Sequence, residues 1–218
     1  MKNTVIFDLD GLLIDSEPVA FQLYCDLTAE YDRHISLEEY IHRYSGKTAV
    51  DNMRTLINAY QLPLTIEDGL AFEAVKEKEY IAKGIPLKQG ARELLSYLQD
   101  RGYKIVLASS SSRERAMEIL TQNQAENAFD QMVFGTEVKR GKPHPDIFIK
   151  ACEYAKEPPQ NCLVLEDSEA GIQAAYAAGI DVICIPDMKI PAETFRKMTA
   201  AELSSLNDVI VWLEQEQA

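Results

Sequence analysis

Short apolar runs alternate along most of the chain with stretches of helical periodicity. The apolar runs lack an alternation of polar and apolar positions, which is typical of parallel strands covered by helices on both faces. Strands that alternate with helices of about 10 to 15 residues predict βα units on a parallel sheet. We expect strands at 4–7, 104–108, 132–134, 162–165 and 182–185, and helices at 91–101, 113–122, 145–155 and 169–178.

Residues 16–83 break this rhythm, because they contain four helical patterns and no convincing strand. Ser36 followed by Glu39 has the spacing of a capping box, and Thr65 followed by Asp68 predicts a second helix start. We therefore expect an α/β fold, in which a Rossmann-like parallel sheet core carries an inserted four-helix cap domain. The expected core is 1–15 with 84–218 and the expected cap is 16–83, with Gly11 and residues 84–86 as candidate hinges.

The amino-acid composition indicates a globular protein and argues against some classes of binding partner. The chain has 218 residues, 46% of them hydrophobic, and 22 Lys and Arg against 35 Asp and Glu, a formal net charge of −13. This hydrophobic content is typical of a globular protein. The acidic charge argues against binding to nucleic acid or to an anionic membrane surface, both of which are held by basic side chains. No apolar run reaches the length of about 18 residues that a membrane span needs.

The cysteines and the start of the chain point to a reduced compartment. Cys25, Cys152, Cys162 and Cys184 form neither a CxxC pair nor a dense disulfide pattern. An acidic residue, Asp8, comes before the apolar region of a signal peptide could develop. We expect a cytoplasmic protein, and a monomer.

Paired carboxylates follow two of the predicted strands. Asp8 and Asp10 come directly after the first strand, and Glu166 and Asp167 follow the run at 162–165. The carboxyl ends of parallel strands border the ligand crevice of such a sheet. Clustered carboxylates need a compensating cation or proton, and hard oxygen ligands suit Mg²⁺. The alternative for each pair is a solvated acidic turn.

Hydroxyl and basic residues occupy two other strand-to-helix connections. Ser109 and Ser110 end the second core strand just before a helix, where free N–H groups and hydroxyls can bind an anion; an ordinary serine N-cap is the alternative. Lys142 lies in a turn before another helix and could neutralise a phosphate or nearby carboxylates, although solvated lysines are common in turns. We assign His144, in the same turn, to packing or capping.

These four motifs, in this order and with a helical insertion after the first strand, resemble the haloacid dehalogenase superfamily of phosphatases and phosphomutases. The resemblance covers essentially the whole chain and is greatest to the subgroup that includes β-phosphoglucomutase and sugar phosphatases. It implies that Asp8 is a nucleophile that forms an aspartyl-phosphate and that Asp10 is the general acid and base. It also implies that Ser109 and Ser110 hold phosphate oxygens, and that Lys142 neutralises charge between the phosphate and Asp8.

The same resemblance implies a Mg²⁺ cofactor. Its ligands would be the carboxylate of Asp8, the backbone carbonyl of Asp10 and the carboxylate of Asp167. Glu166 would bind the metal directly or through an intermediate group. Because dehalogenases of the superfamily lack the second aspartate, the presence of Asp10 favours phosphoryl transfer.

The insertion bears on the choice between phosphatase and mutase. β-Phosphoglucomutase has a histidine and an arginine where this chain has Ala20 and Ala49, so the resemblance favours a phosphatase. Lys47 could partly replace that arginine, and Glu17 resembles an entrance carboxylate of sugar phosphatases; either could equally be a solvated residue. We expect a Mg²⁺-dependent phosphatase acting on a small phosphorylated metabolite of the sugar phosphate class. The alternatives are a β-phosphoglucomutase-like phosphotransferase and a non-catalytic phosphometabolite-binding protein.

Overall fold

The computed structural model describes residues 2–216 and divides into two compact units. The core unit contains the chain up to Asp15 and from Pro86 onward, and the helical unit is Ser16–Ile85. The second boundary lies two residues later than the sequence-based expectation of 84. Residues 1, 217 and 218, which that expectation assigned to the core, lie outside the described residues.

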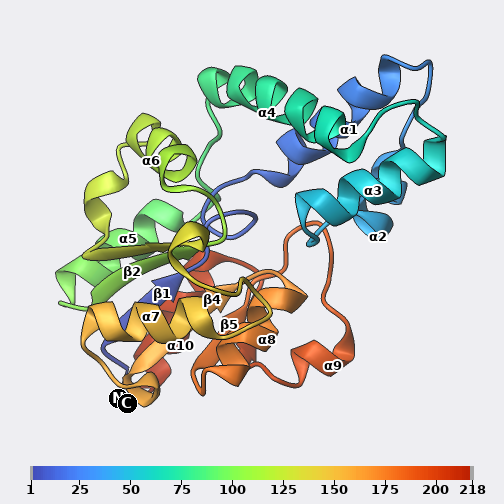
Figure 1. Ribbon diagram of the computed structural model, residues 1–218. Helices are drawn as coiled ribbons and strands as arrows, with labels where there is room; N and C mark the ends of the chain where they lie inside the picture. The colour runs from blue at the N-terminus through green and yellow to red at the C-terminus, as the bar shows by residue number, and fades with distance from the viewer. Residues whose placement is uncertain (1, 217–218) are drawn as a thin grey trace. The chain divides into compact units, whose positions relative to one another are not determined.

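The core unit is built on a six-stranded parallel sheet with the strand order β3-β2-β1-β4-β5-β6 (Figure 1). The first strand in the sequence is therefore central. This architecture confirms the expected Rossmann-like α/β fold. The strands are β1 (Thr4–Phe7), β2 (Lys104–Ser109), β3 (Gln131–Phe134), β4 (Cys162–Glu166), β5 (Asp181–Cys184) and β6 (Ala201–Glu202).

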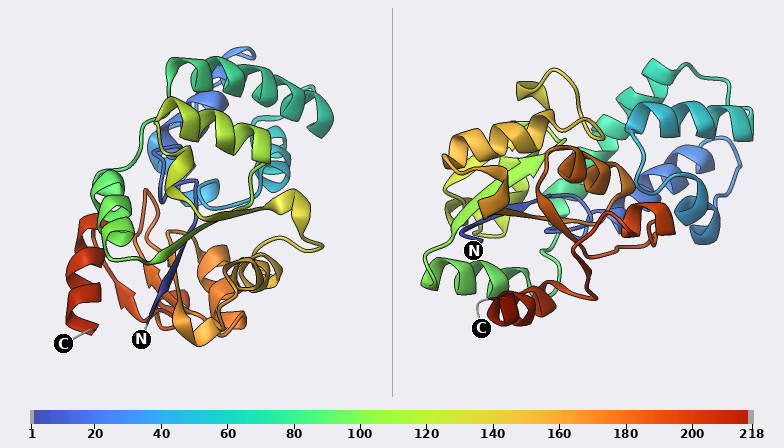
Figure 2. Two further views of the ribbon diagram at one scale, coloured as in Figure 1. Left: turned by 90° about the vertical axis from the view of Figure 1, so that its left-hand side faces the viewer. Right: turned by 90° about the horizontal axis from the view of Figure 1, so that it is seen from below.

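The two faces of this sheet are covered by different helices, as Figure 2 shows. The helices α5 and α10 pack together on one face, and α7 and α8 pack on the other. Alternate strand residues such as Ile6, Val106 and Val164 are buried in the cluster beneath α7 and α8. Both faces are thus apolar, which explains the unbroken apolar runs in the sequence. The core helices are α5 (Ala91–Asp100), α6 (Arg113–Gln122), α7 (Asp146–Ala155), α8 (Glu169–Ala177), α9 (Glu193–Arg196) and α10 (Leu206–Glu216), with short 3₁₀ turns at Glu126–Ala128, Gly135–Glu137 and Pro159–Asn161.

The helical unit contains four helices: α1 (Glu17–Ala29), α2 (Leu37–Arg43), α3 (Ala49–Tyr60) and α4 (Ile66–Lys83). No helix in residues 2–216 combines the length and the apolar character needed to cross a membrane.

The two predicted helix starts differ in detail. Thr65 and Asp68 form a full capping box, with the Asp68 N–H 3.1 Å from the Thr65 hydroxyl and the Thr65 N–H 3.3 Å from the Asp68 carboxylate. Ser36 caps α2 by accepting from the Glu39 N–H at 3.1 Å. The Glu39 carboxylate turns instead to the Tyr60 hydroxyl, 2.6 Å away, and to the Arg43 guanidinium. The expected capping box at Ser36 is therefore only half formed.

The segments of the core unit that lead toward and away from the helical unit are joined to each other. Ile14 and Leu87 form an antiparallel bridge, and the Asp15 N–H donates to the Pro86 carbonyl at 2.9 Å. The Lys88 N–H donates to the Leu13 carbonyl, also at 2.9 Å. The inserted unit thus leaves and rejoins the core at one place, so the sheet is not opened by the insertion.

Candidate active site

Three carboxylates meet at the carboxyl edge of the sheet because β1 and β4 are neighbours. Phe7 is in register with Leu165, and the Asp8 N–H donates to the Leu165 carbonyl at 3.1 Å. Asp8 is 7% exposed and Glu166 is fully buried. One carboxylate oxygen from each of Asp8, Glu166 and Asp167 lies within 4.8 Å of the others. This cluster brings together the acidic residues that the sequence placed after two separate strands.

Lys142 lies between two of these carboxylates. Its ammonium contacts the Asp8 Oδ1 and lies 2.6 Å from the Glu166 Oε1 and 3.3 Å from the Ala108 carbonyl. The lysine side chain is 7% exposed, and its charge lies 4.9 Å from the centre of the Phe148 ring. One buried cation thus faces two buried carboxyl groups.

Burial and mutual attraction shift the protonation of this group. Burial raises the pKa of Asp8 from 3.8 to about 7, against the opposing attraction of Lys142 and with a further rise from Glu166. Burial alone would lower the pKa of Lys142, but Asp8 and Glu166 outweigh that effect and hold its pKa above the ordinary lysine value. The lysine is therefore the charged partner, and a second cation beside Asp8 would favour the carboxylate form of Asp8.

Glu166 uses both of its oxygens within the protein. The Oε1 faces Lys142, and the Oε2 accepts from the backbone N–H groups of Asp167 and Ser168, each at 3.0 Å, and from the Ser168 hydroxyl at 2.9 Å. Asp8 and Asp167 are thus better suited than Glu166 to direct contact with a metal ion. An all-oxygen donor set of this kind suits Mg²⁺, which binds few carboxylates and keeps water for a substrate phosphate.

Two glycines make room for these acidic side chains. A Cβ on Gly11, whose φ is +76°, would lie 2.4 Å from the Asp167 Oδ2. A Cβ on Gly171, in the first turns of α8, would lie 1.7 Å from the Glu166 Oε1 and 1.8 Å from its Cδ. Neither position can carry a side chain while the carboxylates keep this arrangement.

Gly171→Ala is accordingly expected to destabilise the protein. Because the buried Glu166 carboxylate is held on both sides, the added methyl must displace it, and overpacking of this kind costs about 1–3 kcal/mol or more. Urea denaturation measures the loss in the free energy of unfolding. Gly141→Ala is the matched control, since a Cβ there meets nothing within 4 Å. Equal stability of the two variants would contradict the close packing of Glu166 against α8.

The serine run ends β2 and begins α6. Ser109 is 1% exposed, and its hydroxyl accepts from the Ser111 N–H at 3.1 Å. Ser110 is exposed. Ser112 is the N-cap of α6, accepting from the Arg115 N–H at 3.3 Å. The run therefore contains the ordinary serine cap that was the alternative interpretation, while Ser109 directly follows Ala108, whose carbonyl faces Lys142.

Asp10 has partners that the sequence did not predict. Its Oδ2 accepts from the Ser111 hydroxyl at 2.7 Å and from the Arg115 Nη1 at 3.0 Å, and its Oδ1 lies 2.8 Å from the Arg115 Nη2. Arg115 lies in the first turn of α6, and Ser111 directly precedes the Ser112 N-cap of that helix. No local pattern in the sequence indicates this contact, and only the fold shows that Asp10 faces both residues.

The remaining sequence candidates contact other residues. Glu17 accepts from the Tyr40 hydroxyl at 3.1 Å, and Lys47 donates to the Arg43 carbonyl at 2.6 Å, both within the helical unit. His144 is exposed in its turn, where its backbone N–H donates to the Gly141 carbonyl at 3.0 Å. None of the three belongs to the carboxylate cluster.

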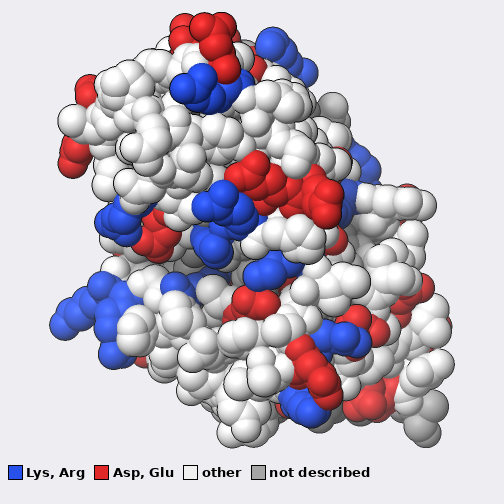
Figure 3. Space-filling view, turned by 90° about the vertical axis from the view of Figure 1, so that its right-hand side faces the viewer, with Lys and Arg blue, Asp and Glu red and all other residues white. Residues whose placement is uncertain are grey.

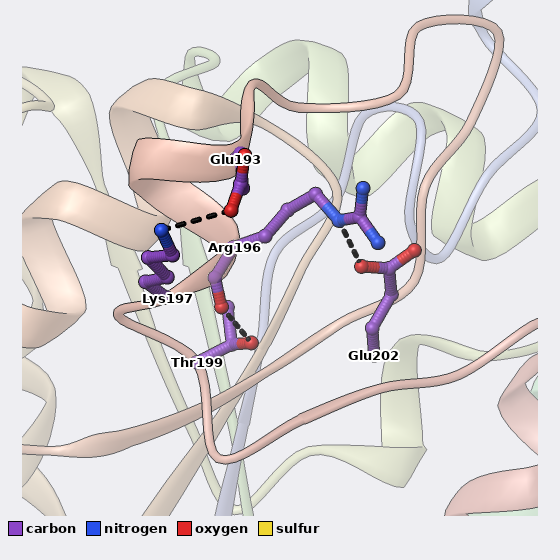
Figure 4. A pocket seen from close by; sticks show the side chains of 5 residues that line it. All are labelled: Glu193, Arg196, Lys197, Thr199 and Glu202. Carbon is purple, nitrogen blue, oxygen red and sulfur yellow. Dashed lines mark hydrogen bonds and ion pairs between the residues drawn. The ribbon is translucent and has the colours of Figure 1, made fainter.

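A separate hollow of about 490 Å³ lies between α9 and β6 (Figure 4). Its charged side chains neutralise one another, because Arg196 contacts Glu202 and Lys197 lies 2.8 Å from Glu193. The hollow shares no residue with the carboxylate cluster. Its chemistry gives no reason to expect a ligand there.

Comparisons with known proteins agree with this geometry. A phosphorylated carbohydrates phosphatase of Thermotoga maritima is 32% identical over 181 residues, which cover 83% of each chain. Hexitol phosphatase A of Escherichia coli is 31% identical over 193 residues, covering 88% of this chain and 85% of that protein. The crystal structure of a HAD family hydrolase from Deinococcus radiodurans with bound phosphate and sodium superposes with a TM-score of 0.83 at 25% identity, covering 98% of this chain and 96% of the other. The family model for haloacid dehalogenase-like hydrolases matches residues 5–185, and the chain is therefore an enzyme of the haloacid dehalogenase-like hydrolase family.

Proposed function

We propose that this chain is a Mg²⁺-dependent phosphatase that hydrolyses a small phosphorylated metabolite, of the sugar phosphate class, through an aspartyl-phosphate on Asp8. The observation that carries the proposal is the buried Asp8 carboxylate held by Lys142 beside Asp167 and Glu166. Similarity to a phosphorylated carbohydrates phosphatase and to a hexitol phosphatase supports the substrate class.

In the first step, the free carboxylate oxygen of Asp8 attacks phosphorus on the side opposite the ester oxygen. The new O–P bond forms as the bond from phosphorus to the ester oxygen breaks. Asp10 gives its proton to the departing alkoxide, so the product leaves as an alcohol. Lys142, already beside Asp8, offsets the charge of the transferring phosphoryl group, which is usually the dominant contribution in such reactions.

In the second step, water attacks the phosphorus of the aspartyl-phosphate. Asp10, now a carboxylate, takes a proton from that water, and the bond between the Asp8 oxygen and phosphorus breaks. Inorganic phosphate leaves, Asp8 regains its carboxylate, and Asp10 regains its proton for the next cycle. Ser109 and Ser110 contribute hydroxyl or N–H groups to the phosphate oxygens.

The metal contribution follows from the donor set. Asp8, Asp167 and the Asp10 carbonyl would hold Mg²⁺, which supplies positive charge to the phosphate oxygens when bound. Glu166, whose oxygens are both occupied, would instead orient Lys142 and the backbone at Asp167 and Ser168. This differs from a direct role for Glu166, which the sequence left open.

The net charge of −13 does not oppose an anionic substrate. Figure 3 shows a face on which Lys and Arg side chains are interspersed among Asp and Glu. The acidic residues therefore do not form a uniform shell there. Local cations such as Lys142 decide anion binding, because charges farther away than about 8–10 Å are screened by physiological salt.

The proposal is tested by phosphate release from a panel of sugar and nucleoside monophosphates, with Mg²⁺ and with EDTA. We expect release from at least one sugar phosphate, loss of release in EDTA, and recovery when Mg²⁺ is added in excess. β-Glucose 1-phosphate is included, and glucose 6-phosphate is measured beside free phosphate. Isomerisation without phosphate release would favour the phosphotransferase, and phosphate binding without turnover would favour the non-catalytic protein. A monomer located in the cytoplasm also stays a prediction.

The role of Asp10 gives a prediction of its own. Asp10→Asn is expected to lower kcat/KM, which reports the first step, about 1,000-fold on an alkyl phosphate and about tenfold on p-nitrophenyl phosphate, because general acid catalysis contributes about 100- to 10,000-fold and an aryl leaving group needs little protonation. Steady-state kinetics on both esters at one pH measures the ratio. An equal loss of kcat/KM on both esters would contradict the acid role of Asp10, whereas a loss of kcat common to both is expected from its base role in the second step.

A further inference from the structure

The geometry points to Arg115 as the positioning residue of the general acid and base, a role that Ser111 shares. Arg115 holds the Asp10 carboxylate in one orientation in the core unit, and its removal is expected to lower the rate of turnover without weakening substrate binding. The inference rests on the proposed function, since it concerns the step that Asp10 performs.

The contact is bidentate. The Nη1 of Arg115 lies 3.0 Å from one Asp10 oxygen and its Nη2 lies 2.8 Å from the other, while the Ser111 hydroxyl donates to the first oxygen at 2.7 Å. Arg115 Nη1 also lies 2.9 Å from the Ser111 oxygen, so the three side chains close into one network. A planar guanidinium that meets both oxygens fixes the plane of a carboxylate, as a lysine ammonium cannot.

The anchor of this network is rigid. Arg115 is in the first turn of α6, where its backbone N–H is bound to the N-cap Ser112 at 3.3 Å. Its side chain is 19% exposed, whereas that of Asp10 is 36% exposed. Asp10 follows the strand and the buried Asp8, at the point where the chain bridges to Ile14. The network thus fixes the more exposed of the two catalytic aspartates.

Fixed orientation matters because Asp10 acts twice in one cycle. It must reach the ester oxygen in the first step and the attacking water in the second. When Asp10 carries its proton, one oxygen presents that proton and the other can stay on the guanidinium. Misplacement of a catalytic group by about 1 Å can cost about 100-fold in rate. Loss of the fixed orientation of Asp10 should therefore lower kcat and leave KM unchanged, since Arg115 and Ser111 act on Asp10 without contacting the phosphate.

The first experiment compares Arg115→Met and Arg115→Lys with the wild-type protein on the best alkyl phosphate and on p-nitrophenyl phosphate. Arg115→Met is expected to lower kcat/KM about 10- to 100-fold on the alkyl ester, with a smaller loss on the aryl ester and KM within about threefold. The rate of Arg115→Lys should lie between those of the wild-type protein and Arg115→Met, because lysine keeps the charge but loses the bidentate contact. Ser111→Ala should lower the rate on the alkyl ester less than Arg115→Met does. Arg113→Met is the matched control: Arg113 begins the same helix but pairs with Glu137 at 3.0 Å, and we expect wild-type kinetics.

The second experiment places Arg115→Met in the Asp10→Asn background. If Arg115 acts through Asp10, the second substitution should lower kcat on p-nitrophenyl phosphate less than twofold further, whereas a merely structural arginine would cost the same in both backgrounds. Thermal unfolding of every variant identifies any loss that comes from unfolding. Wild-type kcat in Arg115→Met, a rise confined to KM, or full additivity with Asp10→Asn would overturn the inference. Retained turnover in Asp8→Asn would instead overturn the proposed function, so the two failures are distinguishable.

Discussion

Asp8→Asn is expected to abolish turnover. The neutral amide is a poor nucleophile, and removing the nucleophile of a covalent mechanism costs about 10,000-fold or more in kcat. The fold should survive, because the amide is the same size and Lys142 keeps its contact with Glu166, 2.6 Å away. Phosphate release is measured beside the trapping of labelled phosphate on the protein in acid. A hydroxylamine-sensitive label in the wild-type protein and none in the variant is the expected result.

The matched control for this variant is Asp181→Asn. Asp181 is the first residue of β5, at the opposite edge of the same sheet, where its 61% exposed side chain pairs with Lys2 at 2.8 Å. We expect this control to turn over at the wild-type rate. Residual turnover above the background of a mock preparation in Asp8→Asn would mean that another group attacks phosphorus.

The second large effect is expected from Lys142→Met, on stability as well as on rate. Asp8 and Glu166 would then be buried without the cation between them, and breaking a buried ion pair from one side costs about 3–5 kcal/mol. Loss of the charge beside the transferring phosphoryl group should also lower kcat about 100- to 1,000-fold. Urea denaturation without metal and steady-state kinetics with saturating Mg²⁺ measure the two effects separately.

Two further variants show whether the loss of stability in Lys142→Met comes from the loss of the buried charge. Lys139→Met removes an exposed lysine three residues earlier and should change stability by no more than about 0.5 kcal/mol. Lys142→Met/Glu166→Gln removes one of the two uncompensated carboxylates, so it should be more stable than Lys142→Met alone. A double variant that is less stable than Lys142→Met would contradict the electrostatic explanation.

Much of the fold could be predicted because the core strands are apolar on both faces. The predicted strands lie within one residue of β1 to β5 at each end. The two-residue β6 was missed, since Ala201 and Glu202 carry no apolar run. The half-formed box at Ser36 could not be predicted either. The Glu39 carboxylate accepts a hydrogen bond from Tyr60, which is far along the chain and comes close only in the folded helical unit.

For the site, the residue types were visible in the sequence but their pairings were not. Asp8 and Glu166 could be assigned to one sheet edge, because each comes at the end of a predicted strand and the carboxyl ends of parallel strands share an edge. Lys142 lies in a turn away from any strand end, and only the resemblance placed it at the site. The contact of Arg115 with Asp10 joins two parts of the chain through the β1–β2 neighbourhood, and no local pattern encodes it. Likewise, Gly171 looks like an ordinary helix glycine until the fold places the Glu166 carboxylate against it.

The central position of β1 also bears on how the chain acquires its structure. Thr4 pairs with Lys104 on one side and with Cys162 on the other, both far along the chain. The helices of Ser16–Ile85 instead contact one another within a short stretch of sequence. Distant pairings form slowly, because the entropy of closing a long loop comes before any gain from the contact. During synthesis, the helical unit can therefore fold while β1 has no partner. The edge that carries Asp8 is completed only after β4 has emerged, so a shortened chain that lacks β4 contains Asp8 without the carboxylates of Glu166 and Asp167.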